Sequence, residues 1–564
     1  MAGGEGGALG RQHARRIAAA RLGLVFALYA LASALLIARH ALADPSHVCL
    51  CVGPAGDPPT YMWSLAWWPH ALGHLTNPLH TNVVWSPAGA NVAAAPMIPL
   101  PSLLLSPVTA LAGPLPSYDV LALLSPAIAA TAMFALCRHV GGRTLPALAG
   151  GWVYGFSSYE LAQLAGHANL MLIALLPLAV LAVLARVERR LGRAAFVAVM
   201  AAVVVAQLLT SQEILATSVG FGALAFAVAW LAAAGPARGV LLATAIETAA
   251  AGAIAAVLMS PYLYYALVRS HPVGPPGADT KFITDLAGLV VPTQVTLIRY
   301  AGGVAARLPG NIAERDAYFG APLLLVLLAA LWTLRRTRAA VVLGAVAGVA
   351  LLLSLGTRLT VAGHRTIPVP WPIAARVPVL KAAVPGRVVL FAWFALALLV
   401  ALWLARPGRR PIARFAAVIA GIALILPDAG SVAYNSPASV PALFSGDGYR
   451  RVIPSGSRAL LLPFGFRGYD MLWQAQAHFA FTMPEGNLTG DTPAPFKTDP
   501  FVRAQLAVPA APVAPAQLAR FLARYRVSRV IVDAAQPESW PALLAADGLH
   551  GEPREGVIVY VVRP

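Results

Sequence analysis

The sequence predicts an all-α polytopic membrane protein with about eleven transmembrane helices and a small C-terminal α/β domain. Three observations carry this prediction: long apolar runs, basic clusters between them, and a tail with a different pattern. The 564 residues are 59% hydrophobic and only 11% charged, and their mean hydropathy is +0.71. A water-soluble fold of this size could not bury so much apolar surface in one core, so the surplus is expected to face lipid.

The apolar runs come close to the roughly 17 to 25 residues that a transmembrane helix needs. They lie at 22–42, 118–137, 145–162, 169–186, 195–211, 214–234, 239–266, 318–334, 339–356, 387–405 and 412–427. The first run follows an arginine-rich segment and lacks a convincing cleavage site, so we expect an uncleaved first helix. The stretch 96–113 is rich in proline, and we expect it to lie at the membrane interface.

The net charge of +18 comes from short basic clusters between the apolar runs. Arginines fall in every predicted inner loop: Arg138, Arg143, Arg186, Arg189, Arg190, Arg193, Arg238, Arg335, Arg336, Arg338, Arg406, Arg409, Arg410 and Arg414. This distribution places residues 1–21 in the cytoplasm by the positive-inside rule. Since the charges form neither a stripe nor a tail, they indicate topology and not nucleic-acid binding.

The predicted membrane orientation assigns the rest of the chain to a transmembrane domain, its outer loops and a domain outside the membrane. A transmembrane domain is predicted at 22–427, with outer loops at 44–117, 267–317 and 357–386. Residues 428–564 then form an extracytoplasmic domain, in which strands at 459–462, 527–532 and 557–562 alternate with a helix near 516–526. Loops of this length are usually functional.

The first outer loop carries the clearest candidate chemistry. Asp57 stands before a segment that contains Trp63, His70, His74 and Asn77. A carboxylate just outside the first span could act as a general base if partial burial adjusts its pKa. Two simpler interpretations stay open: the aromatic residues are typical of interfacial belts, and Asp57 before two prolines is typical of a turn.

Further ionisable residues lie near the predicted outer face, where ionisable groups at membrane depth are costly and often functional. They are Asp44, Glu160, His167, Glu213 and Glu314, with Tyr318 beside the last. Asp44 rivals Asp57 for the catalytic role, although it could also simply cap the first span. Glu213 is equally compatible with a solvated hairpin tip, and His167 with a hydrogen-bonded interface residue.

Two basic residues and two cysteines complete the candidates. Lys381 and Arg387 in the third outer loop could hold a phosphate or extend to lipid headgroups. Cys49 and Cys51 are close in sequence, but three cysteines in all do not make a disulfide scaffold. We therefore expect two small loop residues there, with metal or redox use as the alternative.

The order of these features resembles the GT-C superfamily of membrane glycosyltransferases over about three quarters of the chain. In particular, it is similar to a bacterial group of uncharacterised predicted glycosyltransferases. The residues that carry the resemblance are Gly56-Asp57-Pro58, Asn77-Pro78-Leu79, Trp85-Ser86-Pro87-Ala88-Gly89 and the stretch from Tyr154 to Tyr159, with a proline-rich segment between Pro99 and Pro114.

The resemblance implies inverting transfer of a hexosyl or pentosyl group from a polyprenyl-phosphate donor at the outer face of a bacterial inner membrane. The acceptor would be a glycan, a lipid or a protein. Asp57 would be the base, and Lys381 and Arg387 would be candidates for the donor phosphate. Asp57 has no acidic neighbour, which leaves open whether a divalent cation, Mg or Mn, takes part. A flippase or transporter and a non-catalytic assembly subunit of envelope glycan synthesis remain alternatives.

Overall fold

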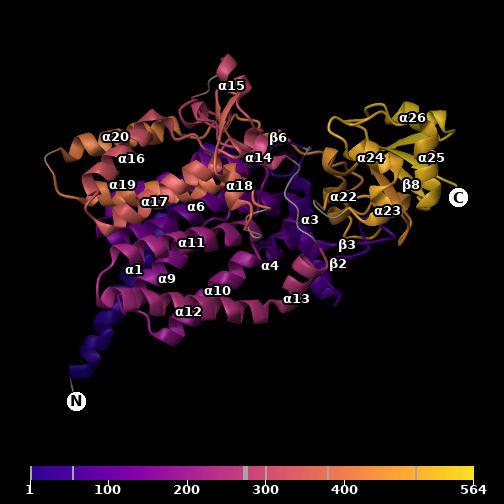
Figure 1. The fold of residues 1–564 in the computed structure, drawn as a ribbon. Coiled ribbons are helices and arrows are strands. Elements are labelled where there is room, and N and C mark those ends of the chain that lie inside the picture. The colour runs from indigo at the N-terminus through magenta and orange to yellow at the C-terminus, as the bar shows by residue number, and fades with distance from the viewer. Residues whose placement is uncertain are drawn as a thin grey trace.

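The computed structural model describes residues 3–53, 56–270, 277–298, 302–377, 380, 382–408, 410–488 and 492–563. Figure 1 shows a body of long helices that run roughly side by side, with the C-terminal segment, residues 428–563, at one end. The N-terminus lies at the opposite end of this body. The chain is mostly helical, as the sequence predicts.

Among the described residues, five helical segments are long and apolar enough to cross a membrane: Arg16–Ala43, Pro114–Gly141 (α6), Gln212–Ala232 (α11), Pro236–Leu258 (α12) and Gly386–Ala405. The first comprises most of α1 (Gly3–Ser33), a π-turn η1 (Ala34–Ala38) and α2 (Arg39–Ala43), and the last comprises η6 (Gly386–Val389) and α19 (Leu390–Ala405). Five shorter apolar helices accompany them: α9 (Leu175–Val187), α10 (Arg193–Leu208), α16 (Gly320–Leu334), α17 (Arg338–Ser354) and α20 (Pro411–Leu424).

Two apolar runs are not the continuous helices that the sequence predicts. The run 145–162 is divided between α7 (Thr144–Gly155) and α8 (Ser158–Leu164), because Ser157 caps a new helix and accepts a hydrogen bond from the Glu160 amide. The run 239–266 ends its α-helix at Leu258 and continues as α13 (Ser260–Leu263) and the π-turn η3 (Tyr264–Val268).

Glycines let α7 approach its neighbours closely. A Cβ added at Gly150 would lie 2.8 Å from the Ala397 carbonyl of α19, and one at Gly155 would lie 2.4 Å from the Pro126 carbonyl of α6. Small residues at helix interfaces permit such close contact in membranes, where the hydrophobic effect does not drive helices together. The central layer of the body is therefore α6, α7 and α19.

The first predicted outer loop folds into mostly short elements at the end of this body that carries the C-terminal segment. They are β1 (Val48–Cys49), α3 (Pro58–Gly73), β2 (His80–Thr81), β3 (Ala90–Asn91), η2 (Val92–Ala94), α4 (Pro99–Leu104) and α5 (Ser106–Ala112). The stretch 96–113 thus forms two short helices and no continuous span. Cys49 and Cys51 form a disulfide, so the expectation of two unlinked loop residues is wrong.

The second and third outer loops contain only short elements. These are α14 (Ala278–Lys281), η4 (Ala287–Leu289), α15 (Gly303–Arg307), η5 (Ile312–Glu314), β4 (Arg358–Val361), β5 (His364–Pro368) and α18 (Trp371–Ala374). Strands β4 and β5 pair as an antiparallel hairpin. This hairpin is tied to the second loop by the Asp285 carboxylate, which accepts hydrogen bonds from the Ala362 and Gly363 amides.

The C-terminal segment contains a four-stranded sheet in the order β7-β8-β10-β9. Strands β7 (Ala459–Leu462) and β8 (Arg529–Asp533) are parallel, whereas β8 with β10 (Val557–Val561) and β10 with β9 (Gly551–Arg554) are antiparallel. The remaining elements are β6 (Ser436–Pro437), α21 (Tyr449–Val452), η7 (Gly465–Arg467), α22 (Asp470–Gln476), α23 (Ala494–Lys497), α24 (Pro500–Leu506), α25 (Pro515–Arg524) and α26 (Trp540–Ala546). The three predicted strands and the predicted helix correspond to β7, β8, β10 and α25, and β9 was not expected.

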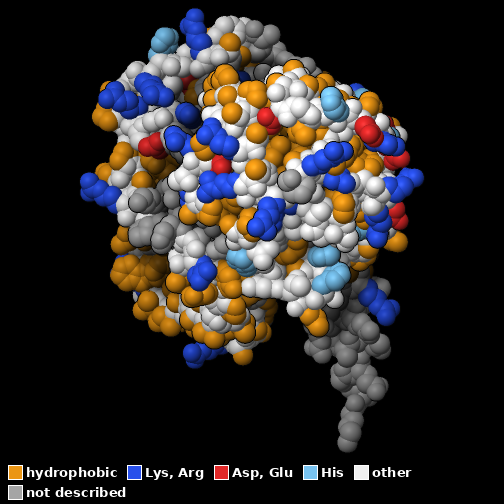
Figure 2. Space-filling model, turned by 90° about the vertical axis from the view of Figure 1, so that its right-hand side faces the viewer, with side chains coloured by type: hydrophobic (Ala, Val, Ile, Leu, Met, Phe, Trp, Pro, Cys, Tyr) orange, Lys and Arg blue, Asp and Glu red, His pale blue; other side chains and the backbone are white. Residues whose placement is uncertain are grey.

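The C-terminal segment contacts the first outer loop. The Trp63 indole of α3 donates to Oε1 of Gln474 in α22 at 2.8 Å, and β1 pairs with β6. The helical body exposes apolar side chains instead, for example Val219, Leu231, Val257 and Leu258 on α11 and α12. An apolar surface of this extent is expected to face lipid. Figure 2 shows the end that carries the C-terminal segment, where charged side chains lie among hydrophobic ones.

Candidate active site

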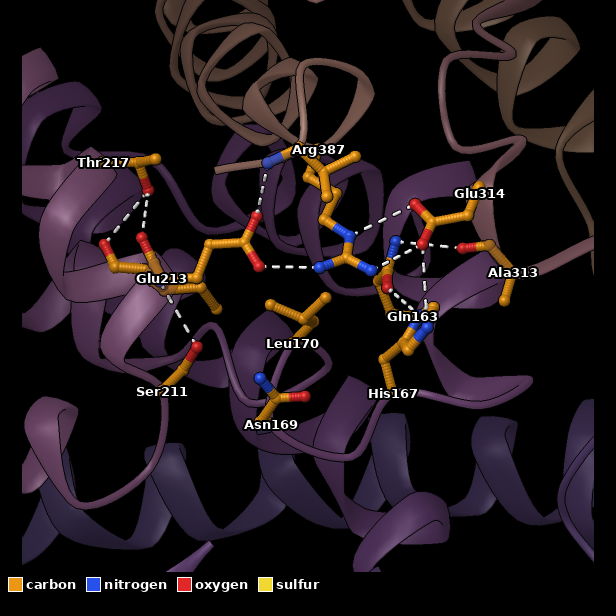
Figure 3. A network of polar contacts seen from close by, with 12 residues as sticks. Gln163, His167, Asn169, Leu170, Ser211, Glu213, Thr217, Ala313, Glu314 and Arg387 are labelled. Atoms are coloured by element: carbon orange, nitrogen blue, oxygen red, sulfur yellow. Dashed lines mark hydrogen bonds and ion pairs between the residues drawn. The ribbon is translucent and has the colours of Figure 1, made fainter. Parts of the chain in front are cut away.

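Arg387 lies at the centre of a polar cluster, between Glu213 and Glu314 (Figure 3). Its Nη1 is 2.6 Å from Oε2 of Glu213. Its Nη2 is 2.5 Å from Oε1 of Glu314, and its Nε is 3.2 Å from the second oxygen of the same carboxylate. The side chains of Arg387 and Glu314 are only 13% and 3% exposed. The two-pronged, shielded contact is the strong form of an arginine–carboxylate pair.

Local sequence explains how each of these side chains reaches the cluster. Gly386 comes so close to Phe282 that an added Cβ would lie 3.1 Å from its carbonyl oxygen, and the turn at Pro385-Gly386 brings Arg387 inward. Glu213 lies in the first turn of α11, which Ser211 caps, and its Oε1 also accepts from the Val384 amide at 3.1 Å. Glu314 ends the 3₁₀ turn η5.

His167 lies on the other side of Glu314. Its Nε2 is 3.6 Å from Oε1 of Glu314, and its Nδ1 is 2.8 Å from Oε1 of Gln163. The Gln163 amide in turn donates to the Ala313 carbonyl at 3.1 Å and approaches Asp316 at 3.4 Å. Burial, and then the charge of Arg387, lowers the pKa of His167 to about 4. The imidazole is therefore neutral near pH 7, as expected of a hydrogen-bonded interface residue.

Asp57 is half-buried at the N-cap of α3 and lies within electrostatic reach of this cluster. Burial raises the pKa of its carboxyl group, while the positive charge of His167, when the imidazole is protonated, and that of Arg387 lower it. A hydrogen bond from Asn487 also favours the ionised form. The structure therefore brings Asp57 together with His167, Glu314 and Arg387, which come from distant parts of the sequence.

Further polar contacts lie near Asp57, and Tyr61 and Asn487 both interact with it. The Tyr61 hydroxyl donates to Oδ1 of Asn169 at 2.6 Å. The Asn487 amide donates to the Gly56 carbonyl at 3.0 Å, and the Asn487 carbonyl accepts from the Thr60 hydroxyl at 2.9 Å. The C-terminal segment thus fixes the turn that carries Asp57. Gln163, Tyr61, Asn169 and Asn487 are not among the predicted site residues, because only the fold brings them here.

Asp44 is placed differently from Asp57. It follows α2 on the surface, where its Oδ1 lies 2.9 Å from Nδ1 of His47 and its side chain is 50% exposed. His47 does not belong to the Arg387 cluster. Of the two rival carboxylates, Asp57 is the one that interacts with that cluster among the described residues.

The predicted aromatic and histidine residues of the first outer loop form a separate group. Trp63 is buried and stacks on Trp67 with 5.0 Å between ring centroids, so it packs within the protein. The His70 and His74 rings lie 4.2 Å apart at the end of α3, and His74 is exposed. The Asn77 amide donates to the Tyr265 hydroxyl at 2.9 Å and joins the loop to η3.

The last three predicted residues are also accounted for. Glu160 is fully buried in α8 and accepts from the Ser125 hydroxyl at 2.8 Å. Tyr318 is buried before α16, and its carbonyl accepts from the Ser158 hydroxyl at 2.7 Å. Lys381 lies outside the described residues.

The cluster does not fit a divalent cation. The Arg387 guanidinium occupies the space between Glu213 and Glu314, and each of the four carboxylate oxygens already accepts a hydrogen bond. Within the described ranges, no three His, Cys, Asp or Glu side chains are arranged to hold one metal ion. The positive charge between these two carboxylates is that of the Arg387 guanidinium.

Solved structures with a similar fold are membrane glycosyltransferases. The arabinofuranosyltransferase AftD from Mycobacteria superposes with a TM-score of 0.61 at 15% identity, over 96% of this chain and 40% of that protein. The oligosaccharyltransferase of Archaeoglobus fulgidus superposes with a TM-score of 0.54 at 12% identity, over 96% of this chain and 74% of that protein. The chain therefore has a GT-C-like fold and spans about two fifths of the length of AftD.

No curated protein matches the sequence. A family model does match residues 26–426, which cover the helical body and the outer loops described above. The chain belongs to the family described as a domain of unknown function, DUF6311.

Proposed function

We propose that the protein transfers a sugar from a polyprenyl-phosphate-linked donor to an acceptor at the outer face of a bacterial inner membrane. The observation that carries the proposal is the position of Asp57 beside the Arg387 cluster, at the outer end of a GT-C-like helical body. The ionised Asp57 carboxylate takes the proton of the acceptor hydroxyl. The acceptor oxygen forms a bond to the anomeric carbon, the bond from that carbon to the phosphate oxygen breaks, and the phosphate leaves with the electron pair.

The neighbouring residues position Asp57 in this reaction. Glu213 and Glu314 hold Arg387, whose charge lowers the pKa of Asp57 and so favours the ionised form that a base needs. Nε, Nη1 and Nη2 of Arg387 each donate a hydrogen bond to a carboxylate, and the two carboxylates already balance the guanidinium charge. Arg387 is therefore proposed as a positioning residue. The Asn487 amide and carbonyl fix the turn before α3.

Two structural neighbours support the proposed reaction class. One is named as an arabinofuranosyltransferase, and the other is an oligosaccharyltransferase that has also been captured with a dolichol-phosphate, at a TM-score of 0.51. A pentosyl or hexosyl group on a polyprenyl phosphate is the corresponding donor for this chain. The acceptor class, a glycan, a lipid or a protein, follows from neither name.

The proposed topology has about eleven spans between residues 22 and 427, with residues 1–21 in the cytoplasm and residues 428–564 forming an α/β domain outside. The N-terminus and the C-terminal segment lie at opposite ends of the helical body in Figure 1, in agreement with this arrangement. Asp57, Glu314 and the contacts of Asn487 would then lie together on the outer side.

The proposal is tested by a donor screen. Membranes from cells with and without the protein are incubated with radiolabelled polyprenyl-phosphate pentoses and hexoses, and label in glycan, lipid and protein fractions is counted. Transfer that appears only with the protein is the expected result. If no donor supports transfer, while the same membranes move labelled lipid between leaflets, the protein is a flippase.

A further inference from the structure

A groove lies where α19 ends and α20 begins, at the end of α19 away from Arg387. It is lined by Trp403, Arg410, Ala413 and Arg414, and water can reach about 400 Å³ of space within it. That space is in the size range of ligand sites. In Figure 1, α16, α19 and α20 lie toward the end of the helical body away from the C-terminal segment. Since α19 has 16 residues and is therefore about 24 Å long, the groove is separate from the proposed reaction site.

The groove carries positive charge that no nearby acidic residue balances. The segment 317–427, which contains α16 to α20, has no aspartate or glutamate. Within the described ranges, neither arginine of the groove forms an ion pair. Glu188, in the predicted inner loop after α9, already lies 3.0 Å from both His139 and Arg190. A negative charge for the groove must therefore come from outside this part of the chain.

A second basic loop lies beside the groove. Nη1 of Arg406 donates to the Thr333 carbonyl at 2.7 Å, which joins the end of α19 to the end of α16. The loop after α16 carries Arg335, Arg336 and Arg338, and all three side chains are exposed. Positive charges crowded in this way repel one another, so binding of an anion at this surface is favourable.

Arg414 is fixed at the wall of the groove. Its Nη1 donates to the carbonyls of Trp403 at 3.2 Å and Arg406 at 2.9 Å. Its guanidinium lies over the Trp403 ring, 5.4 Å from the ring centroid. Nε and Nη2 have no acceptor in the part of the chain that the structure describes. A guanidinium that is already oriented and still has free N–H groups can bind two oxygens of one phosphate.

The start of α20 adds to the positive potential of the groove. Arg410 is the N-cap residue of this 14-residue helix, its side chain makes no capping hydrogen bond, and Pro411 follows it. The first amides of a helix lack partners inside the helix and carry the positive end of its dipole, which favours a bound anion. Arg410, Ala413 and Arg414 share one face of the first turn by their spacing, so both arginines and the helix start belong to the same groove.

The surroundings of the groove suit a lipid headgroup. Ile412 and Ile419 of α20 and Trp332 of α16 are exposed next to the arginine-rich loops. Exposed apolar and tryptophan side chains beside basic loops are typical of the membrane interface, which is where lipid phosphates lie. In the proposed topology this interface belongs to the inner leaflet, whose anionic lipids attract basic segments.

We infer that the groove binds the phosphate of an anionic phospholipid, with the guanidinium groups of Arg410 and Arg414 donating to its oxygens. The Trp403 ring and the neighbouring apolar side chains pack against the lipid beside its headgroup. The excess of arginines favours a lipid with net negative charge over a zwitterionic one, whose own cation would meet the basic loops. Binding does not require the transfer reaction, so it can be measured whether or not the donor screen succeeds.

The experiment uses the full chain in detergent. Retention of phosphatidylglycerol is compared with that of phosphatidylcholine of the same acyl chains by native mass spectrometry. The ionic strength is about 0.15 M, where exposed charges more than about 8 Å apart are largely screened. Wild-type protein is expected to prefer phosphatidylglycerol. Arg410→Gln and Arg414→Gln should each weaken its retention about tenfold, because each removes charged hydrogen bonds to the phosphate. Arg410 is exposed, so Arg410→Gln should keep its stability and stays informative if Arg414→Gln does not fold.

Two arginines outside the groove provide matched controls. Arg336→Gln removes the same charge from the neighbouring loop. Arg238→Gln removes an arginine that resembles Arg414, since its guanidinium lies 4.8 Å from the Trp230 ring centroid and its Nε donates to the Ala233 carbonyl at 2.9 Å. Neither residue lines the groove. Both control variants should retain phosphatidylglycerol as the wild type does.

The outcomes separate a lipid site from general attraction and from a site for a free anion. Selective loss of phosphatidylglycerol in the two groove variants supports the inference. Equal retention of the two lipids by the wild type, unchanged retention in Arg410→Gln, or equal loss in the groove and control variants would show that the groove is no specific site. Calorimetry with inorganic phosphate completes the test. Phosphate binding that Arg410→Gln abolishes, without selective lipid retention, would assign the groove to a free anion and contradict the lipid assignment.

Discussion

Arg387 and Glu314 form a two-pronged ion pair, with Nη2 2.5 Å from Oε1 and Nε 3.2 Å from Oε2, although 73 residues separate them in the chain. The second outer loop and the start of α19 are joined at this point, and Glu213 of α11 completes the contact. The pair therefore links the region around Asp57 to the membrane helices.

Breaking this pair is expected to be costly. Glu314→Gln leaves the Arg387 charge with only Glu213, and loss of one partner from a buried ion pair typically lowers the free energy of unfolding by about 3 to 5 kcal/mol. Unfolding of the purified protein in a denaturing detergent measures the change. Glu213→Gln should have the smaller effect, because Glu213 is more exposed, at 19%, and accepts one guanidinium hydrogen bond instead of two.

A second ion pair provides the control for that experiment. Arg186 and Glu247 also make a two-pronged contact, with distances of 2.6 and 2.8 Å, between α9 and α12 and outside the Arg387 cluster. Glu247→Gln should reduce stability and leave the transfer rate per folded molecule unchanged. If Glu247→Gln reduces the transfer rate as much as Glu314→Gln does, the loss is a general effect of destabilisation, and the proposed positioning role of the Arg387 cluster is contradicted.

Transfer is expected to be independent of added divalent cations. The Arg387 guanidinium already lies between Glu213 and Glu314, so a chelator removes nothing from this cluster. The rate is compared before and after treatment with EDTA, and again after Mg or Mn is restored. Loss of transfer with EDTA and recovery with either ion would contradict the role given to Arg387.

The rate of transfer should rise with pH through the pKa of Asp57, because only the ionised carboxylate accepts a proton. Burial raises that pKa above the ordinary value of 3.8, so the midpoint of the acid limb is expected above 3.8. A pH–rate profile of wild-type membranes measures it. An acid limb that is unchanged in the residual activity of Asp57→Asn would assign the limb to another group.

A buried acidic pair predicts how the stability of the C-terminal segment depends on pH. Burial raises the pKa values of Asp470 and Glu485 well above their usual range, and the charge of Asp470 adds to the shift at Glu485. Their pKa values are higher in the folded state than in the unfolded state. Stability is therefore full below the ordinary value of 3.8 and is lost as pH rises through the folded pKa.

The variant Asp470→Asn should flatten this dependence. Hydrogen exchange at the β7 and β8 amides, corrected for the intrinsic effect of pH, measures local stability in the intact chain. Wild-type protection should fall with rising pH more steeply than that of the variant. Equal slopes in the two proteins would show that Asp470 is ionised in the folded state.

Sequence patterns predicted the helical body because lipid exposure imposes long apolar runs, and the strands at 459–462 and 557–562 because they are short and apolar. The break between α7 and α8 was missed, since Ser157 caps a helix inside an otherwise apolar run. The link between Arg387, Glu213 and Glu314 could not be predicted, because it depends on contacts between residues more than 70 positions apart. Asp57 is predicted from its place after the first span, whereas Asn487 is brought to the same region only by the fold.

The most direct test of the proposed function compares Asp57→Asn with Asp44→Asn in the transfer assay, at matched expression and with both proteins shown to be folded. A general base contributes about 10² to 10⁴-fold, so Asp57→Asn should lower transfer by that factor while Asp44→Asn stays close to wild type. Wild-type transfer by Asp57→Asn, or loss of transfer in Asp44→Asn alone, would contradict the assignment of Asp57 as the base.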